Sequence, residues 1–259
     1  MTNEELGKFI SLENYKETSS SLLKGSEELT GLGVDIVTTT FFGIPVYSLL
    51  KPFTDRINDW ISRVQIKQMA YFLKEFDQLD QSERSEFSVL IQTHEEDFTE
   101  RLFYYISQLN DKKKASLCGN LGVAFARKKI DGQLFMRLIQ LVSKANYDDL
   151  FNFNLKVNKS IKENGDRFDF NDQNMFINFT LFHFTIMKSD YQLLNDLINL
   201  NLVQQEINTD VLSKAVSGPN SKVINLEPIA KALKEFKVKY RFTDLAYFLY
   251  IEGLSKIKV

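Results

Sequence analysis

The stretch FTDRINDWISRVQIKQMAYFLKEFDQL, residues 53–79, carries the strongest structural signal in this chain of 259 residues. Its apolar residues recur mostly at spacings of three and four, as on one face of a helix; they are Ile57, Trp60, Ile61, Val64, Phe72, Leu73, Phe76 and Leu79. Pro52, directly before the stretch, is compatible with a first helical turn, where its missing backbone donor would have no partner. The stretch therefore predicts a long amphipathic helix whose apolar face needs a covering element.

Shorter segments with the same apolar spacing follow. The predicted helices run from Ser82 to about Gln92, from Glu95 to Gln108, from Asp111 to about Phe125, from Asp131 to about Val142, and from Tyr147 to Glu163. Ser82 is the predicted N-cap of the first of them. Gly119 and Gly122 weaken the third helix intrinsically, so we expect a neighbouring helix to cross closely there. Helices this short depend on packing against one another, which predicts an all-helical array.

Composition places the chain among ordinary globular proteins, with 44% hydrophobic and 25% charged residues. The formal net charge of −2 predicts no general attraction to nucleic acid or to anionic membranes. Phe occurs 22 times, so aromatic packing is expected to fill much of the core. A single cysteine, Cys118, excludes an intramolecular disulfide and favours a reducing compartment. Since the opening residues MTNEELGKFI lack a basic and then apolar pattern, we expect no export signal and a cytoplasmic location.

We divide the chain into three parts, with a linker before the last. Residues 1–33 form the predicted polar helical segment, residues 34–163 the helical core domain, and residues 175–259 a C-terminal subdomain. The linker, NGDRFDFNDQN at residues 164–174, is rich in turn-forming side chains.

The C-terminal subdomain mixes helix and strand patterns. Residues 176–187 fit both a buried helix and a strand. A helix at 191–202, strands at Val203–Ile207 and Val238–Phe242, and a last helix at 244–252 capped by Thr243 and ended by Gly253 are expected to follow. This order is typical of a small winged-helix-like unit. The predicted fold class is therefore mainly α, a multi-helix array or bundle with a small C-terminal α+β unit.

The segment IVTTTFFGIPVYSLL, residues 36–50, contains no charged side chain. As a helix with a rise of about 1.5 Å per residue it would extend about 22 Å, short of the roughly 30 Å of a bilayer's hydrocarbon core. Gly43 and Pro45 weaken a helix there further. We expect the segment to be buried in protein or to lie along a surface. Its candidate membrane or partner contacts are Phe41, Phe42, Ile44 and Val46.

Residue types that usually carry catalysis or bind metals are sparse in this chain. The two histidines, His94 and His183, are far apart in the sequence, and no cysteine pair accompanies them. His94 with the acidic residues 95–97 is compatible with an acid–base or metal cluster, but a solvated helix start explains the pattern better. Cys118 falls on an apolar stripe, where a thiol is usually inert. We predict no catalytic residue, metal, cofactor or small-molecule substrate, and the sequence leans against an enzyme.

Basic residues gather at three places. Residues 127–129, Arg-Lys-Lys, follow a predicted helix end, where the helix dipole favours positive charge without any ligand. The candidate basic contact stands at the other, unfavoured end of that helix and consists of Lys112, Lys113 and Lys114. Near the C-terminus, aromatic residues interleave with Lys237, Lys239 and Arg241. That pattern suits nucleic-acid binding, and it equally suits a charged strand edge that prevents pairing with other chains. Acidic residues cluster between Glu75 and Glu100.

The sequence EDFTERLFYYISQLNDKKKASLCGNLGVAFARKKIDGQLFMRLIQLVSKANYDDL, residues 96–150, resembles a widespread group of small bacterial α-helical proteins of unassigned function. The shared features are a Leu-Asn-Asp-x-x-Lys-Ala turn at 109–115, a Lys-Ile-Asp step at 129–131, and a Tyr-x-x-Thr-x-x-Ala-x-x-Leu pattern at 240–249. In outline the chain is also similar to helical proteins linked to abortive infection, a form of phage defence. The resemblance implies a helical fold and a role in defence or its control, and it implies no catalytic residues.

These observations favour a cytoplasmic, non-enzymatic helical protein that acts through a protein partner or through self-association, with bacterial phage defence as the role implied by the resemblance. One alternative is a membrane-acting effector that uses residues 36–50. A second alternative is nucleic-acid binding through the C-terminal unit.

Overall fold

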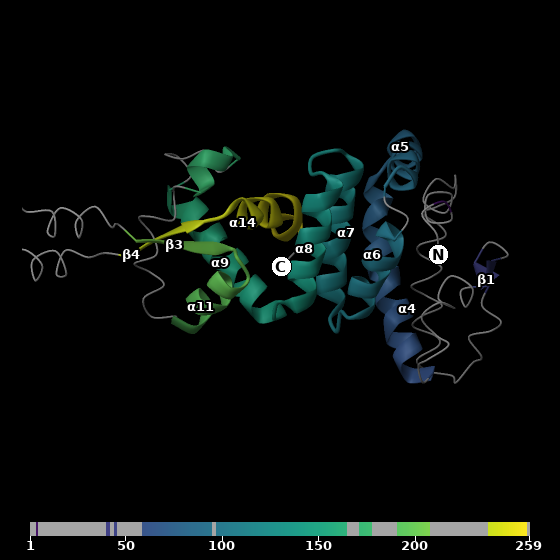
Figure 1. The fold of residues 1–259 in the computed structure, drawn as a ribbon, viewed down its shortest axis with the longest axis horizontal. Helices are drawn as coiled ribbons and strands as arrows, with labels where there is room; N and C mark the ends of the chain where they lie inside the picture. The colour runs from purple at the N-terminus through teal and green to yellow at the C-terminus, as the bar shows by residue number, and fades with distance from the viewer. Residues whose placement is uncertain are drawn as a thin grey trace, which may run out of the picture. The chain divides into compact units, whose positions relative to one another are not determined.

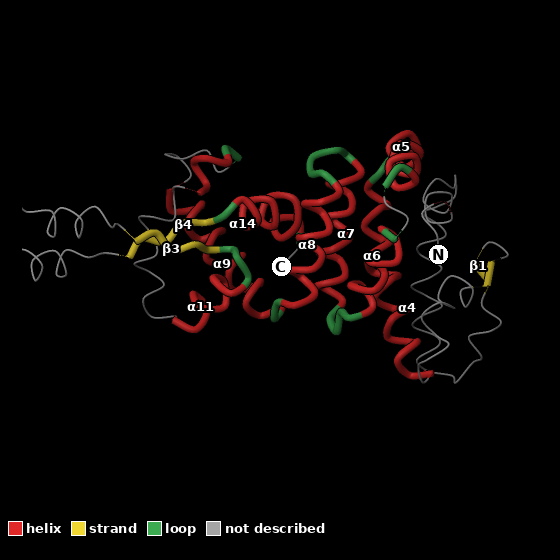
Figure 2. The backbone as a smooth tube through the Cα atoms, in the orientation of Figure 1, coloured by secondary structure: helices red, strands yellow, loops and turns green. Residues whose placement is uncertain are grey.

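The computed structural model describes residue 4 and residues 40–41, 44–45, 59–94, 97–164, 171–177, 191–207 and 238–257. These residues are mainly helical and include short antiparallel strand pairs (Figures 1 and 2), so the mainly α fold class is confirmed. By their contacts the residues fall into two units. The first unit is Met1–Asn154 with Phe248–Val259, and the second is Leu155–Tyr247.

Helix α4 (Asp59–Lys74) continues directly into a turn of 3-10 helix, η2 (Glu75–Gln78). Together they confirm the predicted long helix from Asp59 onward. Its apolar face is turned into the core, since Phe72, Phe76 and Leu79 are each at most 1% exposed. Four side chains of the predicted stripe, Ile57, Trp60, Ile61 and Val64, lie outside the described part.

Helix α5 (Gln81–Gln92) begins earlier than expected, and the prediction of Ser82 as its N-cap is wrong. The N-cap is Asp80, whose carboxylate accepts a hydrogen bond from the Glu83 amide at 2.8 Å. In return, the Glu83 carboxylate accepts one from the Asp80 amide at 2.9 Å. This capping box satisfies two amide groups at once, whereas a serine cap two residues later would satisfy one.

Helix α6 (Phe98–Ser107) starts at Phe98, not at Glu95, and Asp97 occupies its N-cap position. Helix α7 (Lys112–Ala126) starts where predicted, because the Asp111 carboxylate accepts a hydrogen bond from the Lys113 amide at 2.6 Å. Every residue of α7 from Leu117 to Ala126 is buried. Helix α7 is therefore the centre of the first unit.

Two glycines let α4 and η2 approach α7 closely. A Cβ atom built on Gly119 would lie 2.5 Å from the backbone oxygen of Phe72, and one built on Gly122 would lie 2.7 Å from Cζ of Phe76. Real Cβ atoms do not tolerate such distances, so a side chain at either position would push the two helices apart. The predicted close crossing at Gly119 and Gly122 is confirmed.

Helix α8 (Gly132–Lys144) also starts where predicted, with the Asp131 carboxylate accepting a hydrogen bond from the Leu134 amide at 2.7 Å. Helix α9 (Tyr147–Asn164) confirms the expected helix from Tyr147 and buries Leu150 and Phe153. In Figure 1, α4, α6, α7 and α8 lie side by side, as their mutual contacts require.

A chain of phenylalanine rings runs through these helices. Phe76 packs on Phe72 of α4 at a centroid distance of 5.3 Å and on Phe87 of α5 at 5.1 Å. Phe87 meets Phe125 of α7 at 5.6 Å, and Phe125 stacks on Phe135 of α8 at 5.0 Å. Aromatic packing thus joins α4, α5, α7 and α8, as the abundance of Phe suggested.

In the second unit, α11 (Tyr191–Asn199) leads into β3 (Val203–Ile207), which pairs antiparallel with β4 (Val238–Phe242). Both strands have the predicted bounds. The Thr243 hydroxyl accepts a hydrogen bond from the Ala246 amide at 3.3 Å, which confirms Thr243 as the cap of the helix that begins with α14 (Asp244–Phe248). The winged-helix-like unit is not confirmed, because residues 208–237 lie outside the described part.

Two boundaries in the C-terminal half differ from the prediction. The end of the expected linker is helical, since residues 173–177 form a helical turn whose Met175 amide donates to the Asp172 carboxylate at 2.8 Å. After α14 the chain continues as a π-helical turn, η4 (Leu249–Gly253), and a 3-10 turn, η5 (Leu254–Lys256), so Gly253 does not end the last helix. Of residues 176–187, Phe176 and Ile177 are helical and the rest are outside the described part.

Four residues of the uncharged segment are described. Thr40–Phe41 (β1) and Ile44–Pro45 (β2) form an antiparallel pair in which Phe41 stands opposite Ile44. Phe42, Val46 and the other residues of 36–50 lie outside the described part, as do the side chains of Phe41 and Ile44. Within the ranges that the structure describes, no helix combines the length and the apolar character needed to cross a membrane.

Candidate functional site

A groove of about 740 Å³ lies between α6 and α8 in the first unit. Helix α6 contributes Phe98, Arg101 and Tyr105 to its lining, a spacing of three and four that marks one helix face. Helix α8 contributes one face as well, consisting of Gln133, Met136, Arg137 and Gln140. The volume is typical of a protein's ligand-binding sites, which makes this groove the leading candidate site.

Both helices begin at the same end of the groove, where His94 closes it. The His94 ring stacks on Phe98 at 4.7 Å between ring centroids, with an angle of 15° between the ring planes. A Cβ atom built on Gly132, the first residue of α8, would lie 2.5 Å from Cε1 of His94. The absence of a side chain at Gly132 therefore lets the imidazole pack flat against the start of α8.

The alternative acid–base or metal cluster of His94 with residues 95–97 is not tested, because residues 95 and 96 lie outside the described part of the chain. The Nε2 atom of His94 is buried and has no hydrogen-bond partner in the described part of the chain. The His94 ring packs against Phe98 and, at 5.3 Å between ring centroids, against Phe125. No group of metal-binding side chains occurs among the described residues. His183 lies outside them.

Two arginines give the groove its charge. Arg101 forms an ion pair with Asp97 one turn earlier on α6, at 3.3 Å, and both side chains are about half exposed, at 46% and 57%. Arg137 is exposed and has no ion-pair or hydrogen-bond partner among the described residues. The single acidic lining residue, Asp131, is committed to capping α8. The lining therefore carries a net positive charge, and the hydrogen-bond donors of Arg137 have no partner among the described residues.

Of the first basic triplet, the candidate contact at Lys112, Lys113 and Lys114, one member is taken up by the protein's own structure. Lys114 is 4% exposed, and its Nζ atom donates to the backbone oxygens of Ser143 at 3.0 Å and Ala145 at 2.9 Å, at the C-terminal end of α8. Burial lowers the pKa of Lys114. Lys113 is exposed and lies over the ring of Tyr147 at 5.0 Å. Of the predicted contact, Lys112 and Lys113 remain on the surface.

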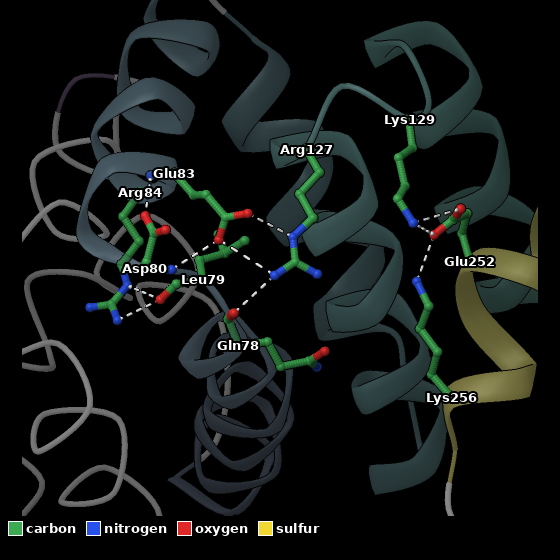
Figure 3. A network of polar contacts seen from close by, with 9 residues as sticks. All are labelled: Gln78, Leu79, Asp80, Glu83, Arg84, Arg127, Lys129, Glu252 and Lys256. Atoms are coloured by element: carbon green, nitrogen blue, oxygen red, sulfur yellow. Dashed lines mark hydrogen bonds and ion pairs between the residues drawn. The ribbon is translucent and has the colours of Figure 1, made fainter.

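The second triplet, Arg127 to Lys129, is bound to acidic residues, as Figure 3 shows for two of its members. Arg127 donates to the Glu83 carboxylate at 2.9 Å and to the backbone oxygen of Gln78 at 3.0 Å. Lys128 forms an ion pair with Glu86 at 3.1 Å. Lys129 reaches Glu252 at 3.2 Å. Part of the acidic cluster between Glu75 and Glu100 is therefore neutralised inside the first unit.

Backbone geometry explains why the second triplet lies at this corner. Lys128 has a positive φ of 56°, the left-handed conformation that often ends a helix. Its amide donates to the Phe125 oxygen at 2.9 Å, and the Lys129 amide donates to the Ala124 oxygen at 3.0 Å. These two bonds form a Schellman motif that ends α7 and turns the three side chains toward their acidic partners.

The C-terminal basic residues lie in the second unit. Lys239 and Arg241 are on β4, where they stand opposite Glu206 and Gln204 of β3. Lys237 is outside the described part, as is the side chain of Lys239. An acidic residue directly opposite a basic one is typical of a pair that stabilises the sheet itself.

The sequence did not single out the groove, because its two walls are separated along the chain by all of α7. Arg101 and Arg137 each lie beside an apolar stripe, at positions that a periodicity analysis assigns to solvent. The signal that was available is the identical three-and-four spacing of polar and large side chains on both helices.

Comparison of the chain with protein-family models, with curated proteins and with solved structures finds no match.

Proposed function

We propose that this chain is a non-enzymatic helical protein that acts by binding a protein partner, or a second copy of itself, through the groove between α6 and α8. The observation that carries the proposal is the set of polar groups that the groove leaves unused. The Arg137 guanidinium and the amides of Gln133 and Gln140 have no hydrogen-bond partner in the described part of the chain. All three lie on one face of α8.

Two other arginines of the first unit differ from Arg137, because their guanidinium groups are bound within the protein. Arg84 donates twice to the backbone oxygen of Leu79, at 3.0 and 2.7 Å, and Arg127 binds Glu83. Their charges hold helices together, whereas the charge of Arg137 faces a hollow surface. A groove with surplus donors beside apolar side chains matches the composition of protein interfaces, in which arginine, aromatic residues and methionine are enriched.

A cytoplasmic location and a role in bacterial phage defence complete the proposal. The location is supported by the single cysteine, Cys118, which is buried and unpaired in the described part of the chain. The role in defence is supported by the resemblance of residues 96–150 to bacterial helical proteins.

Native mass measurement of the purified protein, alone and after incubation with bacterial cell extract, tests this function. We expect a complex of higher mass for the parent protein and for a Lys144→Ala, Asn152→Ala control, which changes exposed helix positions outside the groove. A Gln133→Ala, Arg137→Ala, Gln140→Ala variant should stay monomeric. A parent protein that is monomeric under all conditions would refute the proposal. If the groove variant formed the complex as well as the parent protein, the partner would bind elsewhere than in the groove.

Nucleic-acid binding through a winged-helix-like C-terminal unit is the second candidate. The observation that favours it is the antiparallel β3–β4 pair followed at once by a capped helix, with Arg241 on β4. Binding of this kind weakens steeply with salt, because cations are released from the phosphate backbone. We expect Lys239→Glu with Arg241→Glu to abolish it in an electrophoretic mobility assay. Indifference of binding to salt and to both changes would exclude this function.

Membrane action through residues 36–50 is the third candidate. Liposome flotation tests it directly, because a Phe41→Asp, Ile44→Asp variant should lose any membrane association that the parent protein shows. Equal flotation of the variant and the parent would refute this candidate.

A further inference from the structure

The length of the groove sets the size of what it holds. Its lining on α6 spans from Phe98 to Tyr105, and its lining on α8 spans from Gln133 to Gln140. Seven residues of helix rise about 10 Å. An extended chain advances about 3.3 Å per residue, so about three residues of an extended segment match this length.

The polar groups of the groove match the chemistry of a peptide. A side-chain amide carries both donors and an acceptor, so Gln133 and Gln140 can each pair with a backbone N–H and C=O group. Guanidinium groups bind carboxylates through two parallel hydrogen bonds. Arg137 lies between the two glutamines on α8 and Arg101 lines the α6 wall, so the two guanidinium groups suit an acidic side chain.

The ion pair of Arg101 with Asp97 does not block such binding. Both side chains are about half exposed, and exposed pairs of this kind contribute little stability. A peptide carboxylate that binds Arg101 can also bind Arg137. The Arg137 guanidinium has no partner among the described residues of the chain.

Apolar contacts favour a peptide over a free anion. The open side of the groove leaves both arginines exposed to water, where a small anion gains little from an ion pair. A peptide adds contacts to Met136 and Tyr105, which line the groove beside the charged groups. These contacts supply the desolvated area that polar groups alone do not provide.

We propose that the groove between α6 and α8 binds an extended acidic segment, about three residues long, of a partner protein. In this arrangement Arg101 and Arg137 hold an Asp or Glu side chain of the segment, and Gln133 and Gln140 bind its backbone. The proposal rests on the proposed function and adds the chemistry of the partner to it.

Fluorescence anisotropy with a labelled Gly-Glu-Glu-Glu-Gly peptide tests this binding. We expect saturable binding that weakens about tenfold or more in Arg137→Gln, since charge-assisted hydrogen bonds are the strongest of those available. The matched control is Lys144→Gln, which removes one exposed positive charge from the same helix outside the groove. It should change the affinity less than twofold. Thermal melts of both variants verify that they are folded.

Four outcomes would overturn the inference. The first is no binding of the acidic peptide at millimolar concentration, and the second is an equal loss of affinity in Arg137→Gln and Lys144→Gln, which would indicate general charge attraction. The third is competition by free glutamate or inorganic phosphate as strong as that by the unlabelled peptide, which would make the groove a small-anion site. A Gly-Gln-Gln-Gln-Gly peptide should bind more weakly than the acidic one, and equal binding of the two would also refute the inference.

The outcome separates this inference from the proposed function. If Arg137→Gln loses nothing in the peptide assay while the higher-mass complex depends on the groove, the acidic segment is wrong and the partner-binding function stands. If the peptide binds as expected while the protein stays monomeric in every extract, the proposed function fails and the peptide site stands.

Discussion

Gly119 of α7 lies so close to Phe72 of α4 that a Cβ atom at Gly119 would be 2.5 Å from the Phe72 backbone oxygen. Because the opposing atom belongs to the backbone, a small side-chain rotation cannot relieve the contact. The crossing of α4 and α7 therefore depends on a glycine at this position, and the buried side chains on both helices depend on the crossing.

Gly119→Ala is expected to destabilise the protein by about 1–3 kcal/mol, as overpacking does in other cores. In an exposed helix the same change would stabilise by up to about 1 kcal/mol, because alanine has the higher helix propensity. Urea denaturation measures the difference in the free energy of unfolding. Asn152→Ala, at an exposed position of α9, is the control and should be nearly neutral. A stabilised Gly119→Ala variant would contradict the close crossing.

Phe135→Ala is expected to cost about 3–5 kcal/mol of unfolding free energy, the usual cost of removing a buried phenylalanine ring. Phe135 is fully buried and stacks on Phe125 with an angle of 9° between the ring planes. Val89→Ala provides the comparison, since Val89 is 61% exposed and should lose no more than about 0.5 kcal/mol. Similar losses of unfolding free energy at Phe135 and Val89 would show that the packed phenylalanine rings do not form the core.

The Glu252 carboxylate is expected to make stability depend on pH. Burial raises its pKa, but hydrogen bonds and charges from Lys256 and then Lys129 outweigh burial and hold the pKa below its ordinary value of 4.5. Its contribution is therefore fully present above pH 4.5 and is lost as the pH falls through the lower, folded-state pKa. Glu252→Gln should cost about 1 kcal/mol at pH 7, because it removes a carboxylate that accepts hydrogen bonds from two lysines.

Unfolding curves of the parent and of Glu252→Gln at several pH values between neutral and strongly acidic test this prediction. The difference between the two proteins should shrink as the pH falls below the ordinary carboxyl range. Glu100→Gln, at an exposed position of α6, serves as the control and should stay close to the parent protein throughout. A difference that is constant across the whole pH range would rule out the ionised Glu252 as its source.

The Cys118 thiol is expected to be unreactive in the folded protein. It is completely buried, and burial raises its pKa to about 12, so the reactive thiolate is scarce at neutral pH. A chromogenic disulfide reagent should modify Cys118 slowly in native buffer and rapidly in denaturant. Fast modification of the native protein, at a rate independent of stabilising conditions, would contradict the buried position.

Much of the fold was determined by the sequence alone. The three-and-four spacing of apolar residues gave the helices, and Asp111, Asp131 and Thr243 gave three of their starts. The bounds of β3 and β4 were predicted correctly, as was the close crossing at Gly119 and Gly122. These features follow from local chemistry: side-chain periodicity, hydrogen bonding of a helix's first amides, and the missing side chain of glycine.

Tertiary structure alone decided the roles of the charged residues and the position of the groove. Lys114 was expected at a surface contact, yet it donates to the end of α8, because folding brings residues 29 and 31 positions further along the chain next to it. In the sequence, Arg101 and Arg137 have the pattern of ordinary solvated side chains. Only the packing of α6 against α8 places them in one groove. Periodicity tells which face of a helix is buried, but the helix that meets that face, and the polar groups left without partners beside it, depend on contacts between distant residues.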